Sequence, residues 1–111
     1  PVPTPTPKPQ YTLELLSWNC TKGEYGYAYI KGEVKNISGD RLTNVQAVGT
    51  WRTSSGEFID SDSVLIEFTV LLPRQASPLE VMTRHNPEMD RCGLHFKEFF
   101  GGTIPTLYPT P

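Results

Sequence analysis

The feature that most constrains this chain is an alternation of apolar and polar residues with period two, in two runs joined by a polar turn. The alternate positions of the first run are Ala28, Ile30, Gly32 and Val34, and those of the second are Val45, Ala47, Gly49 and Trp51. Such alternation is typical of strands with one buried face. Between the runs, residues 36–40 are of the types that form turns. The pattern predicts strands at residues 26–35 and 44–53.

The rest of the chain has the same character, with no helical period. We expect further strands at residues 12–20, 57–59, 63–71, 76–83 and 93–100, separated by Gly, Ser, Asn, Asp and Pro. This spacing predicts an all-β fold, an immunoglobulin-like antiparallel β-sandwich of about seven strands. The expected core is Leu13, Leu15, Ile30, Val34, Val45, Ala47, Trp51, Ile66, Phe68, Val81, Leu94 and Phe96. In the first strand Leu13, Leu15 and Ser17 share a face in this interpretation.

Proline marks the ends of the expected domain. Residues 1–10, PVPTPTPKPQ, have proline at every second position, and residues 105–111 are also rich in Pro and Thr. Proline lacks an N–H donor and fixes φ, so we expect a spacer at 1–10, one folded domain at 11–104 and a tail at 105–111. Because the chain starts inside a proline-rich tract, we expect it to be a segment of a longer protein.

Composition excludes several classes of function. The net charge is −2, and no run of basic residues suggests binding to nucleic acid or to an anionic membrane. No apolar run reaches the about 18 residues of a membrane-spanning helix. We therefore expect no direct membrane insertion by this segment.

The two cysteines, Cys20 and Cys92, are far apart in the sequence. An even number of cysteines in a small, Thr- and Pro-rich chain favours a disulfide formed in an oxidising compartment. Two buried free thiols in a cytosolic protein are the alternative. A disulfide would predict an extracellular or cell-surface location.

Residues that bear chemistry match no catalytic or metal-binding motif. His85, Asp90, Cys92 and His95 do not have zinc-ligand spacing, and the Asp60–Asp62 segment lacks the Gly and Glu of a calcium loop. No G-x-S-x-G nucleophile motif occurs. We expect no catalytic residues, metal or cofactor. Asn19 and Asn36 begin N-glycosylation sequons, and Asn36 is also typical of a turn whose side chain bonds to nearby backbone.

Aromatic residues are the one feature with binding potential. Tyr25, Tyr27 and Tyr29 fall at period two in one expected strand, so we expect them on one solvent-facing side. A row of exposed aromatics can hold sugar rings, whereas ordinary packing on a sheet face is the alternative. These tyrosines form the candidate ligand face.

The ordered run resembles the FxLYD domain, a β-sandwich module of bacterial and archaeal cell-surface proteins. Residues 32–39 are similar to the family's G-x-V-x-N-x-S/T-G strand and turn, residues 42–45 to its L-x-n-V, and residues 72–79 to its L-x-P-G-x-x-s-p-F. The naming motif differs at four of five positions, with Gly49 for its phenylalanine and Trp51 for its leucine. Arg74 stands where the family has a turn glycine.

The resemblance implies a β-sandwich at the cell surface. We expect a non-catalytic module, either a spacer or a protein-interaction domain, of a larger secreted or lipid-anchored prokaryotic protein. A carbohydrate-binding module tethered to a secreted hydrolase is the alternative, because Pro/Thr linkers and exposed aromatics are common there. An exposed edge strand that pairs with a partner is a third. The expected partner is therefore a protein or a polysaccharide.

Overall fold

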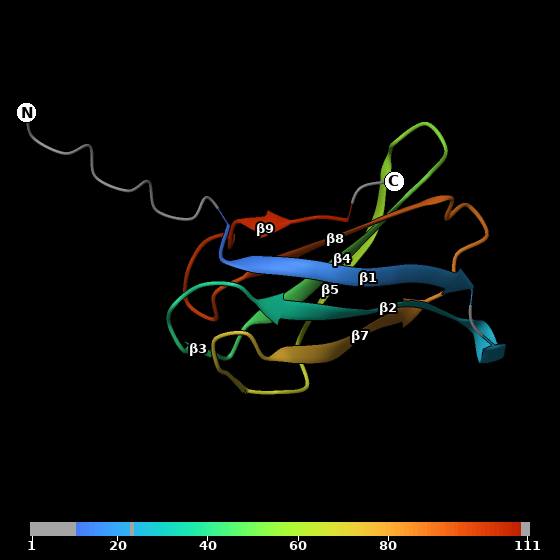
Figure 1. The fold of residues 1–111 in the computed structure, drawn as a ribbon. Helices are drawn as coiled ribbons and strands as arrows, with labels where there is room; N and C mark the ends of the chain where they lie inside the picture. Colours follow the sequence, from blue (N-terminus) through green and yellow to red (C-terminus); the bar gives the residue numbers. More distant parts are fainter. Residues whose placement is uncertain (1–10, 23, 110–111) are drawn as a thin grey trace, which may run out of the picture.

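The computed structural model describes residues 11–22 and 24–109, and these form a β-sandwich (Figure 1). A short 3₁₀ turn at Glu24–Gly26 joins the first two strands. The strands are β1 Leu13–Lys22, β2 Tyr27–Asn36, β3 Leu42–Thr43, β4 Gln46–Arg52, β5 Phe58–Leu65, β6 Val70–Leu71, β7 Ala76–Arg84, β8 Arg91–Lys97 and β9 Thr106–Leu107. The predicted all-β sandwich is confirmed.

Two sheets form the layers of the sandwich. One has the order β7-β2-β1-β9 and the other β5-β4-β8, and β3 with β6 makes a two-stranded ribbon. Figure 1 shows β1, β2 and β7 in one layer with β4, β5 and β8 behind them. All pairings are antiparallel except that of β1 with β9. The expected strands at 57–59 and 63–71 are divided differently, into β5 and β6, and the two-residue strands β3 and β9 were not predicted.

A β-bulge in β1 decides which of its residues face the core. The register with β2 shifts between Leu15 and Ser17, so that Leu15 lies opposite Val34 whereas Cys20 lies opposite Ile30. Val34 and Ile30 are both fully buried. The extra residue at a bulge reverses the parity of everything after it. The expectation that Ser17 shares the face of Leu15 is therefore wrong, since Ser17 is exposed.

The core lies between the two sheets and contains eleven of the twelve expected residues. The exception is Phe68, which is 39% exposed. β5 ends at Leu65, and the N–H of Ile66 donates to Val45 O, so the alternation of β5 does not continue to residue 68. Core residues that the pattern did not single out are Leu71, Leu79, Met89 and Ile104.

The turn after β2 is organised by the side chain of Asn36, which is completely buried. Its Nδ2 donates to Asp40 O and Leu71 O, and its Oδ1 accepts from the N–H and Oγ of Ser38. The predicted role of Asn36 as a turn residue is confirmed. Its carbonyl also accepts from the N–H of Arg74, so this residue joins two turns.

Arg74 adopts a left-handed backbone conformation of the kind that favours glycine. Its φ is 70°, and the N–H of Gln75 donates to Leu72 O across the turn. Proline at the second position and a left-handed third residue are the features of a type II turn. The turn type is therefore the one that glycine favours, although a side chain in this conformation costs about 1–2 kcal/mol.

The C-terminal segment belongs to the fold beyond the expected boundary at residue 104. Thr106 and Leu107 form β9, and Thr106 is buried. The N–H groups of Thr12 and Leu13 both donate to Pro105 O, and the hydroxyl of Tyr108 donates to Leu94 O. This segment is thus attached to β1 and to β8. Residues 1–10, the expected spacer, lie outside the described residues.

Candidate functional site

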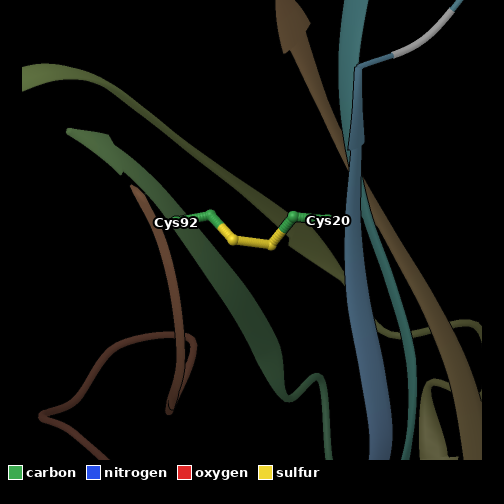
Figure 2. The surroundings of a disulfide bond; sticks show 2 residues. All are labelled: Cys20 and Cys92. Atoms are coloured by element: carbon green, nitrogen blue, oxygen red, sulfur yellow. A yellow bond between two sulfur atoms is a disulfide. The ribbon is translucent and has the colours of Figure 1, made fainter. Parts of the chain in front are cut away.

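The predicted disulfide joins the two layers. Cys20 of β1 and Cys92 of β8 are bonded, with their Cα atoms 6.6 Å apart (Figure 2). Immunoglobulin domains place a similar inter-sheet disulfide beside a buried tryptophan, but it starts from the second strand. Here Trp51 is buried and lies opposite Cys92 in the β4–β8 register. The bulge in β1 directs Cys20 inward, so it is the local feature that makes the bond possible.

The structure separates the three tyrosines of the candidate ligand face. Tyr27 and Tyr29 lie on the outer face of β2, where Tyr29 is opposite Met82 of β7. Tyr25 lies in the turn before the strand, with φ 65° and an exposed fraction of 89%. Both Tyr25 and Gly26 have positive φ because the chain reverses there between β1 and β2. The expectation that Tyr25 shares the strand is wrong.

The remaining aromatic face is partly covered. The Nζ of Lys31 lies 5.4 Å from the centroid of the Tyr29 ring, within cation–π range. The same Nζ is 3.9 Å from the carboxylate of Glu80 on β7. Tyr27, by contrast, is 36% exposed. The outer face of this sheet therefore presents one free tyrosine ring beside an engaged one, rather than a flat row of three.

The acidic and histidine residues considered for metal binding are dispersed. His95 lies opposite Val48 on the outer face of the second sheet, whereas His85 follows β7 and donates its backbone N–H to Gly26 O. Asp60 accepts a hydrogen bond from the hydroxyl of Thr83. Across residues 11–22 and 24–109, no three His, Cys, Asp or Glu side chains come together in an arrangement suited to a metal ion.

Burial distinguishes the two sequons. The side-chain amide of Asn36 is buried and fully engaged, which leaves no access for a glycan. Asn19 is exposed.

In the described part of the chain, no helix has the length and apolar character needed to cross a membrane.

A groove lies at the end of the sandwich where β1 begins. Residues 41–45, which include β3, form one wall, and the loop between β8 and β9 forms the other. Its volume is about 420 Å³, and buried Val45 and Ile104 are among its lining residues. Thr12 and Pro105 also line it. This volume lies within the range of ligand pockets in proteins, which starts at about 300 Å³.

Two phenylalanines give this groove an aromatic wall. The rings of Phe99 and Phe100 pack edge to face with centroids 4.4 Å apart. Phe100 is 96% exposed and Phe99 is 45% exposed. Arg41 and Glu98, both exposed, bring opposite charges to the groove. Two adjacent exposed rings form a contiguous apolar patch, and such patches can mark sites of interaction.

Sequence reasoning did not identify this groove. The strand predicted at residues 93–100 included both phenylalanines, but β8 ends at Lys97. The Gly101-Gly102 pair was a usable signal, because two consecutive glycines mark a turn. Residues directly before such a turn can belong to the loop rather than to the strand. Residues 41–45 come from a distant part of the sequence, and only the fold brings them opposite the loop.

Comparison with known proteins gives a likeness in fold. No family model matches the chain, and no curated protein matches it. A crystal structure of a DUF1425 family member from Shewanella sp. PV-4 is similar, with a TM-score of 0.56 and 17% sequence identity, covering 81% of each chain. At this identity the likeness concerns the fold alone, so this chain has the β-sandwich architecture of that protein.

Proposed function

We propose that this chain is a non-catalytic interaction module, acting as a spacer or protein-binding domain of a larger secreted or surface-anchored prokaryotic protein. The observation that carries the proposal is the groove with Phe99 and Phe100 at its edge. Exposed aromatic rings next to a concave, partly apolar surface favour protein contacts, and their burial on binding is favourable. Opposite charges at Arg41 and Glu98 would orient a bound segment.

Two further observations support the family and the location in this proposal. The G-x-V-x-N-x-S-G segment of the FxLYD resemblance coincides with the strand and turn that Asn36 organises. The Cys20–Cys92 disulfide favours an oxidising compartment, as a surface protein would have. We propose membership of the FxLYD family and a surface location on these grounds.

Carbohydrate binding is the second candidate, and the exposure of Tyr27 on the outer sheet face favours it. Sugar rings stack on open aromatic faces, and β2 offers one such ring. The cover of Lys31 over Tyr29 and the separation of Tyr25 reduce the platform. The groove therefore supports the protein-binding function better.

The test is to bind the purified chain to two fractions of the parent cell's envelope, its polysaccharides and its proteins. Three forms are compared: the unaltered chain, Phe100→Ala and Tyr27→Ala. Our proposal expects saturable binding to the protein fraction that Phe100→Ala reduces at least about tenfold, as for an interface hot spot, and that Tyr27→Ala leaves unchanged. Binding to polysaccharide that only Tyr27→Ala abolishes would establish the second candidate instead.

A further inference from the structure

The groove at the end of the sandwich has two chemically different walls. One is the free edge of β3, and the other carries the exposed rings of Phe99 and Phe100. Among the described residues β3 pairs with β6 alone, and no residue of β6 lines the groove. The groove therefore lies on the side of β3 that faces away from β6. An occupant has to match a hydrogen-bonding wall and an aromatic wall at once.

The register of β3 shows which backbone groups face the groove. Asn44 donates its N–H to Thr69 O, so Asn44 and Thr69 are a hydrogen-bonded pair. The pair next to it, Thr43 and Val70, must then direct its N–H and C=O groups away from the ribbon. Thr43 therefore presents one donor and one acceptor to an extended segment in the groove. A free strand edge of this kind is a template for an added strand.

An extended segment with proline at every second position also has two different edges, one with N–H donors and one with proline rings. In an extended chain, successive residues direct their N–H groups to opposite edges. In residues 1–10 the prolines occupy all odd positions, and the N–H groups belong to Val2, Thr4, Thr6, Lys8 and Gln10. All donors then lie along one edge, while the other edge carries pyrrolidine rings. Such a segment can pair on one side only, and aromatic side chains commonly bind proline rings.

We propose that the groove is the binding site for the alternating-proline segment of the same chain, residues 1–10. These residues lie outside the described part of the structure. Thr12, which lines the groove, follows the segment after only one intervening residue, Tyr11. The segment is thus tethered at the site with an effective concentration in the millimolar range, so weak contacts suffice.

Charge supports the same occupant. Lys8 carries the only charged side chain of the segment. It matches the exposed carboxylate of Glu98 on the aromatic wall, whereas Arg41, of like charge, belongs to the β3 wall. If the groove also binds an external protein, as the proposed function on which this inference rests requires, then residues 1–10 and that partner compete for one groove. The partner class is then also an extended strand, which must displace residues 1–10.

The experiment measures amide hydrogen exchange in the full 111-residue chain by NMR. One form carries Pro3→Ser, Pro5→Ser and Pro7→Ser. We expect the Thr43 N–H to exchange about tenfold faster in this form, because it loses its partner. The Val70 N–H, on the other edge of the same ribbon, is the internal control and keeps its rate. Dilution should leave both rates unchanged.

Two background variants sharpen the test. In Phe100→Ala, the proline substitutions should no longer change the Thr43 rate, whereas in Phe58→Ala, an exposed ring of β5, they should act as in the unaltered chain. Equal Thr43 rates with and without the prolines would overturn the inference. A Thr43 rate that rises on dilution would also overturn it and would identify a second copy as the occupant. Because no partner is present, the result is independent of the envelope-binding test.

Discussion

Gly49 and Trp51 show how one residue can compensate for another in a buried sheet face. A Cβ atom added to Gly49 would lie 2.9 Å from Ile30 Cδ1, 3.0 Å from Val81 Cγ1 and 3.2 Å from Trp51 Cη2. The Trp51 ring thus reaches the space above Gly49. A large side chain at one of these two positions therefore excludes a large one at the other, so that volume can be exchanged between neighbours on one face.

This exchange predicts strong coupling between the two positions. Gly49→Phe alone overpacks the core, and Trp51→Leu alone leaves a cavity, so each single change should lower the free energy of unfolding by at least about 2 kcal/mol. The double variant should lose less than the sum, with a coupling free energy of about 1–3 kcal/mol. Urea unfolding of the four forms measures it. Additive losses would contradict the packing that we describe.

At the scale of elements, the bulge in β1 sets the direction of Cys20. Leu16 is the extra residue between the two registers of β1 with β2, and it is 40% exposed. Deleting it would leave Trp18 and Cys20 opposite the same β2 residues. Deleting Asn19 would instead move Cys20 to the outer face, because one residue reverses the parity of a strand.

The two deletions therefore have different expected outcomes. The chain without Leu16 should fold with its disulfide formed, whereas the chain without Asn19 should contain two free thiols. Counting thiols with a chromogenic reagent, before and after denaturation, distinguishes them. If both deletions preserve the bond, or both abolish it, the bulge does not direct Cys20.

The C-terminal segment gives an element-scale prediction about pH. Burial raises the pKa of Tyr108 above the ordinary value for tyrosine, and its hydroxyl donates to Leu94 O, which requires the proton. A raised pKa means that the protonated form is favoured in the folded state. The stabilisation is therefore complete below about pH 10, the unfolded value, and is lost as the pH rises through the folded value.

Absorbance of tyrosinate against pH measures this shift. Tyr108 should ionise later in the folded chain than in the unfolded chain, and that late component should be missing in Tyr108→Phe. The variant should also lose about 1 kcal/mol of stability at neutral pH, the net contribution of one hydrogen bond. A late component that persists in Tyr108→Phe would show that another tyrosine carries it.

At the scale of the whole molecule, the disulfide holds the two sheets together across a sequence separation of 72 residues. A cross-link over so long a loop restricts the unfolded chain strongly, by about 4 kcal/mol on the loop-entropy account. The Cys20→Ser/Cys92→Ser chain should therefore lose about 2–5 kcal/mol of stability. Thermal unfolding with and without reductant checks this. Equal melting temperatures would show that the sheets pack independently of the bond.

Local patterns in the sequence were sufficient for the sandwich and most of its core, because period-two alternation reports burial directly. They failed where the chain changes direction. The bulge in β1 places Ser17 on the outer face, and Tyr25 lies in the turn before β2 rather than in the strand. Phe68 is exposed because β5 ends before it. The groove also escaped prediction, since its walls come from residues 41–45 and 98–105, and no local pattern relates two such segments.

The most direct test of the central claim is site-specific photo-crosslinking in the parent organism, with a photoreactive phenylalanine analogue at position 100. The matched control is the same analogue at position 27, on the outer face of β2. The proposed function predicts a discrete cross-linked protein from position 100 and none from position 27. Cross-links from position 27 alone, or none from position 100 under the same irradiation, would contradict a binding role for the groove.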